Sequence, residues 1–287
     1  MILQVLLNGL LLGGLYGVVA LGFSLVYGVM GIINLAYGSL IMLGSYLTYV
    51  LLKRVGIDPF ITVPIVMAAM FVIGYVLQRF LINRVARSGM LLTMVITFGL
   101  NISLINIALL IWSPDYVAAS PKYSGTSFTL AGIVIPEVQL MVFTLALALG
   151  GFLYFLLNRT KTGLAIRAVA LHREASQLIG VNLSHTYGLT FGIGAALAGG
   201  AGALVGTTHP IHPFMGEPFL LRSFVITVLG GLGSVPGVMI GGLVLGLAET
   251  LGASFVGPGY QEAIAFVLLV IVLIIRPQGL LGKKFYG

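Results

Sequence analysis

The residues of this sequence that could do chemistry are mostly uncharged hydroxyl and amide side chains inside long apolar runs. Thr93, Thr97 and Asn101 recur every four residues, so they would form one polar stripe on a helix. Further candidates stand at two Gly-rich interruptions of apolar runs. The whole set is Asn34, Tyr37, Ser39, Thr93, Thr97, Asn101, Ser223 and Thr227. Each side chain alone could bond a neighbouring helix or its own i−4 carbonyl, but we expect the set to line a polar translocation pathway.

The sequence contains no grouping of nucleophile, acid and base that would indicate an enzyme. His209 and His212 stand in a Pro-broken loop but lack the third and fourth ligands that a zinc site requires. The phosphate-binding Gly-x-x-x-x-Gly-Lys-Ser/Thr loop of an ATPase is absent, and cysteine is absent too. We therefore expect no catalytic residue, no metal and no cofactor bound by this chain. If the chain is a transporter, the absence of an ATPase loop means that its energy would come from another subunit. A passive channel is the alternative.

Composition indicates which elements must position these groups. The 287 residues are 59% hydrophobic and only 7% charged, whereas a soluble domain is about a quarter charged. Apolar stretches of about 17 to 25 residues, enough to cross a bilayer, recur along the chain. We expect one all-α integral membrane domain over residues 1–287, with its first apolar run a membrane span rather than a signal peptide. The expected segments, about eight in number, are roughly 2–27, 31–52, 60–82, 91–112, 138–157, 187–206, 223–251 and 262–276.

The positive charges predict how the segments are oriented. Ten of the 14 Lys and Arg residues form three clusters, which the positive-inside rule assigns to the cytoplasm. The clusters are Arg79, Arg84 and Arg87; Arg159, Lys161, Arg167 and Arg173; and Arg276, Lys283 and Lys284. Lys53, Arg54, Lys122 and Arg222 are then left outside. The net charge of +7 is explained by this orientation, so the lipid bilayer and not nucleic acid is the expected partner.

The joint before segment 187–206 and the C-terminus are both expected in the cytoplasm. Segment 187–206 then leaves the cytoplasm and segment 262–276 returns to it, so segment 223–251 must start and end outside. We therefore expect a re-entrant hairpin that turns at 230–237, near the middle of the membrane, because Gly and Pro break helices. The first half is interrupted at 31–39, and both interruptions end in Gly-Ser, which suggests an internal repeat. If the first interruption is also a hairpin, the N-terminus lies inside. The expected helix-breaking residues are Gly38, Gly230, Gly231, Gly233, Ser234 and Pro236.

The longest cytoplasmic joint, 158–186, carries helix-forming residues between Gly163 and Gly180. Its pattern alone fits either a docking helix or a helix lying on the membrane surface. Within it, Glu174-Ala175-Ser176-x-x-x-Gly180 resembles the Glu-Ala-Ala-x-x-x-Gly loop by which ABC importer permeases dock on their ATPases. Ser176 departs from the second alanine of that pattern.

The whole chain resembles the branched-chain amino-acid ABC permease family. Besides the docking loop, the matching stretches are Gly14 to Gly28, Asn34 to Gly38, Gly230 to Ser234, and Arg276 to Gly282. The resemblance implies a prokaryotic inner-membrane importer with a second homologous permease subunit, two cytoplasmic ATPases that hydrolyse ATP, and an external solute-binding protein. It implies that branched-chain or other small amino acids are carried. The ATPase-coupling residues would be Gly163, Arg167, Arg173, Glu174, Ala175, Ser176 and Gly180.

A self-contained channel or facilitator for urea or another small polar solute is the alternative function. The residues do not decide between these solutes, because solute choice can reside in a separate binding protein. They also leave open whether the partner permease is a second copy of this chain.

Overall fold

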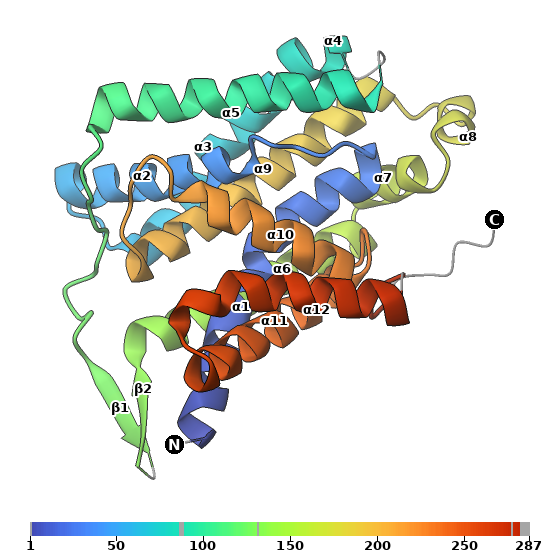
Figure 1. Ribbon diagram of the computed structural model, residues 1–287. Helices are drawn as coiled ribbons and strands as arrows, with labels where there is room; N and C mark the ends of the chain where they lie inside the picture. Colours follow the sequence, from blue (N-terminus) through green and yellow to red (C-terminus); the bar gives the residue numbers. More distant parts are fainter. Residues whose placement is uncertain (1, 86–88, 131, 277, 282–287) are drawn as a thin grey trace.

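The protein is a bundle of long helices with one small β-hairpin at a corner, as the computed structural model shows (Figure 1). It describes residues 2–85, 89–130, 132–276 and 278–281, so Arg87, Pro277, Gly282, Lys283 and Lys284 lie outside the described residues. Seven helices of the described chain are long and apolar enough to cross a membrane. The expected all-α membrane fold is therefore confirmed, with seven such spans in place of about eight segments.

The helices of the first half, in chain order, are α1 (Ile2–Met30), α2 (Tyr37–Val55), α3 (Pro59–Leu77), the π-helix η1 (Gln78–Ile82), α4 (Asn83–Val85) and α5 (Met90–Trp112). Strands β1 (Ser127–Leu130) and β2 (Ile133–Pro136) form an antiparallel hairpin. The remaining helices are α6 (Glu137–Arg159), α7 (Lys161–Leu171), α8 (Arg173–Leu178), α9 (Leu183–Thr208), α10 (Gly216–Gly230), α11 (Val235–Phe255), the 3₁₀-helix η2 (Pro258–Tyr260) and α12 (Gln261–Ile275).

Helices α1 and α9 form the centre of the bundle, and α5 and α12 are its most exposed spans. Helix α11 packs antiparallel along α1 at glycine positions. A β-carbon at Gly13 would lie 2.7 Å from the Leu243 Cα, so the two backbones are in near contact. Such contact at small residues provides the van der Waals packing that holds helices together where lipid removes the hydrophobic drive.

The described residues of the basic clusters share one end of the molecule, which we call the α8 end. Arg79 donates to the Tyr75 hydroxyl, which contacts His185 near the start of α9, directly after α8. The backbone after α12 also reaches this end, where Leu280 N donates to the Leu229 carbonyl at 2.7 Å. The Lys53 and Arg54 pair ends α2, on the opposite side of the bundle (Figure 1).

Segment 223–251 belongs to a helical hairpin, but the turn does not lie near the middle of the membrane as predicted. Helix α10 begins at Gly216, and α11 begins at Val235. The turn lies at the α8 end, because the Gly233 N–H donates 3.3 Å to the Ser24 hydroxyl near the end of α1. With 15 and 21 residues, the two helices measure about 22 Å and about 32 Å at 1.5 Å per residue. It is the start of α10, and not the turn, that lies inside the bundle.

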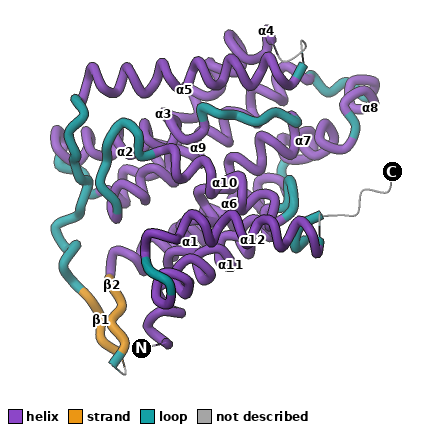
Figure 2. The backbone as a smooth tube through the Cα atoms, in the orientation of Figure 1, coloured by secondary structure: helices purple, strands orange, loops and turns teal. Residues whose placement is uncertain are grey.

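The helix packing repeats between the two halves of the chain, although not through the Gly-Ser positions. Helix α1 packs on α10 and α11, and α9 packs on α2 and α3 in the same way. By this correspondence segment 31–36 matches 209–215, and the α10–α11 turn matches the α2–α3 turn. Helix α2 packs along α9 and α3, so α1 and α2 do not form a hairpin. Segment 31–36 instead connects them as non-helical chain that ends in a turn at Leu35 and Ala36 (Figure 2).

Candidate functional site: two helix starts inside the bundle

Helices α2 and α10 both begin inside the bundle, where their first turns touch through glycine. A β-carbon at Gly38 would lie 2.5 Å from the Gly216 carbonyl oxygen, and one at Gly216 would collide with the Gly38 carbonyl. Any larger residue at either position would push the two helices apart. From this junction the helices run toward opposite ends of the molecule (Figure 1).

A small pocket lies beside this junction. Its lining comes from the first turns of α2 and α10, from the middle of α5 and from the loop before α10. The lining residues are Gly38, Ser39, Asn101, Ile105, Pro213, Gly216, Glu217 and Leu220. Of the eight residues that sequence patterns predict for a pathway, Ser39 and Asn101 therefore line one pocket. Positive helix ends and a few polar groups among apolar residues can hold a small polar solute without a fixed counter-charge.

The structure does not bring the other six predicted residues into this pocket. Four of them hold the local fold. Asn34 Oδ1 accepts from Ala36 N at 3.1 Å and the Tyr37 hydroxyl donates to the Val19 carbonyl at 2.7 Å. Thr93 donates to the carbonyl of Gly89, and Ser223 donates to that of Phe219.

Thr97 and Thr227, the remaining two, differ from these. Thr97 Oγ1 accepts from Leu35 N at 3.2 Å and lies 3.4 Å from the Ile33 carbonyl oxygen, so it fastens segment 31–36 to α5. The Thr227 hydroxyl is buried without a hydrogen-bond partner. A buried hydroxyl left unpaired is costly and calls for an explanation, such as water or a second conformation.

The predicted helix breaks lie as follows. Gly231 and Gly233 have φ of 95° and 74°, values that favour glycine. Gly230 ends α10, and Ser234 caps α11 by accepting from Gly237 N at 3.2 Å, with Pro236 in the first turn. Gly38 is not itself a break, because it is the second residue of α2. The interruption in the first half is the non-helical segment 31–36.

The predicted coupling residues lie on α7 and α8 or follow them directly. Gly163 is packed so closely on the end of α6 that a β-carbon would meet the Leu156 carbonyl. Arg167, Glu174 and Ala175 are exposed, whereas Ser176 is buried and donates to the Arg173 carbonyl at 2.7 Å. Gly180 has φ of 88°, a left-handed conformation that favours glycine. No atom lies within 4 Å of a β-carbon built there, so close packing is not the reason for this glycine.

Arg173 is exposed like its neighbours Glu174 and Ala175, but its side chain also reaches the bundle. Its guanidinium donates to the carbonyl of Met30, the last residue of α1, and lies 5.7 Å from the centre of the Tyr187 ring. The first turn of α8 is thereby joined to the chain immediately before segment 31–36.

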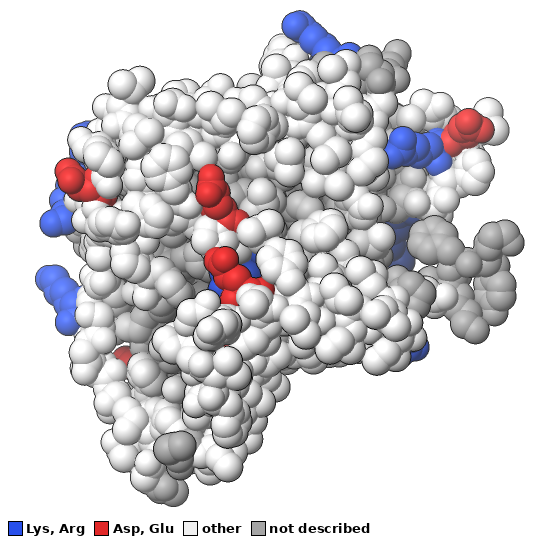
Figure 3. Space-filling view, in the orientation of Figure 1, with Lys and Arg blue, Asp and Glu red and all other residues white. Residues whose placement is uncertain are grey.

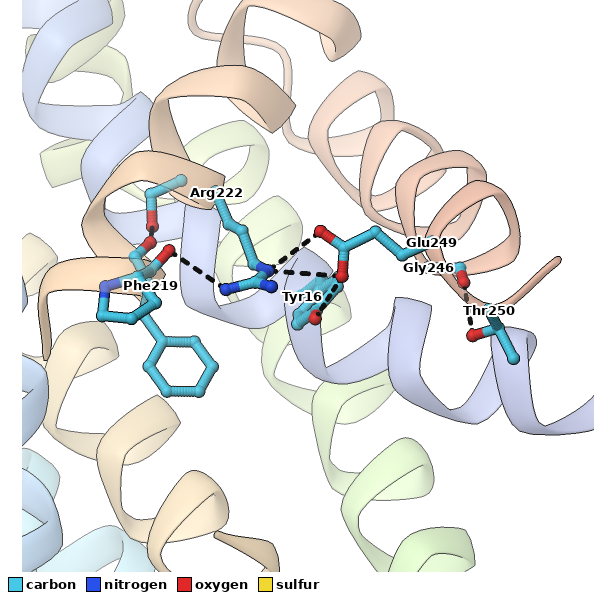
Figure 4. A network of polar contacts seen from close by, with 8 residues as sticks. Tyr16, Phe219, Arg222, Gly246, Glu249 and Thr250 are labelled. Carbon is cyan, nitrogen blue, oxygen red and sulfur yellow. Dashed lines mark hydrogen bonds and ion pairs between the residues drawn. The ribbon is translucent and has the colours of Figure 1, made fainter. Parts of the chain in front are cut away.

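A buried charged network is the feature that sequence reasoning missed. Glu249 on α11 is 0% exposed and accepts from the Tyr16 hydroxyl at 2.7 Å and from Arg222 Nε at 3.0 Å (Figure 4). The Arg222 guanidinium also lies 5.3 Å from the centre of the Tyr16 ring. The charge pattern left Arg222 outside the membrane, but the structure has it within helix α10. The sequence did contain a signal for this pair. Charges inside a membrane protein pair with each other, and Arg222 and Glu249 each stand in a largely apolar stretch.

The two histidines before α10 each contact a neighbouring side chain. Among the described residues, no group of three or more His, Cys, Asp or Glu side chains could hold a metal ion. His209 contacts the Thr208 hydroxyl at 2.8 Å, and the His212 ring packs on Tyr116. Burial lowers the pKa of both histidines, which favours neutral rings near pH 7.

Long apolar helices around two helices that begin inside the bundle define a polytopic membrane protein of the permease class. The chain belongs to the family described as branched-chain amino acid transport system / permease component, whose model matches residues 5–273.

Similar proteins cover nearly the whole chain. The high-affinity branched-chain amino acid transport system permease protein BraD of Pseudomonas aeruginosa is 35% identical, over 98% of this chain and 96% of its own. LivH of Escherichia coli (strain K12), a permease protein of the same description, is 34% identical over the same shares. A probable LivH of Methanocaldococcus jannaschii is 29% identical over 97% of this chain and 92% of its own. No solved structure matches the chain.

Proposed function

We propose that this chain is the membrane-spanning subunit of an ATP-driven importer of branched-chain or other small amino acids. The observation that carries the proposal is its similarity, over 98% of its length, to permease proteins named for branched-chain amino acid transport. In this proposal the chain works in a prokaryotic inner membrane with a second homologous permease, two ATPases and an external binding protein. The partner ATPases hydrolyse the ATP, and this chain binds no cofactor.

The solute would pass along the exposed side of the α2–α10 junction. Asn101 offers hydrogen bonds there, whereas the Ser39 hydroxyl donates to the Ala36 carbonyl at 2.8 Å and keeps only its capacity to accept. The starts of α2 and α10 bring positive dipole ends to the same pocket. Helix α5 is among the most exposed spans, so the face beside this pocket is open to a partner permease. Two such faces, one from this chain and one from the partner permease, would together enclose the pathway.

Movement of the ATPases would enter at α8, which we place on the cytoplasmic side with the basic clusters. Glu174 and Ala175 are exposed there, while Arg173 connects α8 to Met30. From Met30 the non-helical segment 31–36, held by Thr97, leads directly into the first turn of α2 at the pocket. A shift of α8 would therefore reach the pathway through six non-helical residues.

Co-purification tests the assembly. ATPase subunits should be recovered with the tagged chain from its native membrane, and Ala175→Leu should reduce their recovery because added bulk blocks the exposed face of α8. Ala170→Leu, on the exposed surface of α7, is the matched control. Normal recovery of the ATPases with Ala175→Leu would contradict this docking site. Isolation of the wild-type chain without any ATPase, together with downhill solute flux through it alone, would favour a self-contained channel.

A further inference from the structure

A loop on the side of the bundle opposite α8 joins two walls of the α2–α10 pocket. Residues 113–126, which we call the strap, connect α5 to β1. Val117 N donates to the Ile211 carbonyl at 3.0 Å, and Ile211 N donates to the Val117 carbonyl at 2.7 Å. Ile211 belongs to segment 209–215, which leads into α10. The chain that leaves α5 is therefore paired with the chain that enters α10 (Figure 1).

This paired bridge lies between the pocket and the end of the molecule that faces away from α8. Asn101 of α5 and Pro213 of segment 209–215 both line the pocket. Beyond Asn101, α5 continues to Trp112, and Ile211 stands two residues before Pro213. A solute that reached the pocket from this end would pass between α5 and segment 209–215, which the bridge holds together.

The end of the molecule that carries the strap is accessible to water. Asp115 and Lys122 of the strap are exposed, and Figure 3 shows charged side chains along the left edge, where this end lies. In the orientation proposed above, with α8 in the cytoplasm, it is the outer side. An imported solute would arrive from here.

The strap begins with backbone strain. Ser113, the first residue after α5, has φ of 62° and ψ of 173°, and among the described residues it is the only one other than glycine with a positive φ. Residues other than glycine persist in this region only where surrounding contacts impose it. Trp112 stacks on Tyr46 with ring centres 4.4 Å apart, which holds the end of α5. The bridge at Val117 holds the other side, so its release would relieve the strain.

The rest of the strap is fastened independently of the bridge. Ala119 is fully buried, and its N donates to the Gly206 carbonyl at 3.2 Å. The Tyr123 hydroxyl donates to Asp58 at 2.9 Å. These bonds attach the strap to the end of α9 and to the start of α3, so movement is confined to residues 113–118.

We propose that residues 113–118 are a gate on the outer side of the pocket. Separation of Val117 from Ile211 lets a solute pass between α5 and segment 209–215 and lets Ser113 relax, and renewed pairing closes the passage. A loop that never moved would be served better by glycine at position 113. This assignment rests on the proposed function, since it presumes that the solute reaches the α2–α10 pocket from this side.

Cross-linking tests the gate cleanly because the chain has no cysteine of its own. Val117→Cys with Ile211→Cys places thiols on a pair that exchanges both backbone hydrogen bonds, at a Cα separation of about 5.5 Å that a disulfide can span. In proteoliposomes of the complete transporter, the oxidised variant should lose leucine uptake, and a reductant should restore it. Thr129→Cys with Val134→Cys, directly opposed on the β-hairpin, is the matched control and should transport normally in both states.

Ser113→Gly is the second variant. Glycine relieves strain only in the closed gate, so uptake should fall about fivefold, the effect of the smallest cost of such a conformation. The melting temperature should rise. Ser124→Gly, exposed in the fastened part of the strap, is the control, because both variants gain the same freedom in the unfolded chain.

Full uptake with the 117–211 disulfide in place would overturn the gate. Should that disulfide not form or the variant not assemble, Ser113→Gly decides, and uptake equal to that of Ser124→Gly would reject the proposal. Failure of the proposed function looks different, since the wild-type complex itself would not accumulate leucine.

Discussion

The guanidinium of Arg173 donates a hydrogen bond to the carbonyl oxygen of Met30, which joins the first turn of α8 to the last residue of α1. If this bond transmits ATPase movement, Arg173→Gln should separate ATP hydrolysis from transport. We expect normal assembly and continuing hydrolysis, with leucine uptake reduced about tenfold by loss of a charge-assisted bond. Arg159→Gln, exposed at the end of α6 and outside the predicted coupling set, is the control. Uptake that stays proportional to hydrolysis in Arg173→Gln would contradict this role.

Thr97→Val should weaken the attachment of segment 31–36 to α5. Valine keeps the volume of threonine but cannot accept from Leu35 N, so we expect a loss of about 0.5 to 1.5 kcal/mol in stability. Uptake should fall at normal assembly. Thr144→Val on α6 removes a hydroxyl that bonds only the Leu140 carbonyl of its own helix. If both variants transport alike, Thr97 is a packing residue and not part of the link.

Gly38→Ala should disturb the junction of α2 and α10. The new methyl would lie 2.5 Å from the Gly216 carbonyl oxygen, and backbone cannot move aside as a side chain can. We expect a cost of about 1 to 3 kcal/mol, seen as a lower melting temperature in detergent. Gly99→Ala on α5 meets no atom within 4 Å and should be neutral or slightly stabilising. An unchanged melting temperature for Gly38→Ala would mean that the two helix starts do not meet.

Tyr16→Phe should destabilise the bundle while keeping the aromatic ring beside Arg222. It removes the 2.7 Å bond to the fully buried carboxylate of Glu249, for which we expect a loss of about 1.5 to 3 kcal/mol. Tyr154→Phe on the exposed face of α6 is the control. Equal thermal stability of the two variants would show that Glu249 does not depend on this hydroxyl.

The sequence predicts the helices well because apolar length and glycine or proline interruptions are local properties. It also predicts a polar stripe on α5, since Thr93, Thr97 and Asn101 share one face by helical period alone. It does not predict which neighbour each side chain meets. Thr97 meets segment 31–36 and Asn101 meets a pocket, because α2 starts inside the bundle.

Contacts between residues far apart in the sequence could not be predicted. Arg222 and Glu249 are separated by 27 positions, and their contact follows from the hairpin of α10 and α11 rather than from any local pattern. The repeat is hidden for a similar reason. Helix packing relates the two halves, whereas the matching Gly-Ser pairs fall at positions that do not correspond.

Uptake of leucine by the complete complex in proteoliposomes tests the central claim most directly. The complex comprises this chain, its partner permease, the two ATPases and the binding protein, with ATP supplied on the side of α8. We predict leucine accumulation above its external concentration, lost when ATP is replaced by a non-hydrolysable analogue. Equilibration of leucine without accumulation, at the same rate with and without ATP, would contradict an ATP-driven importer.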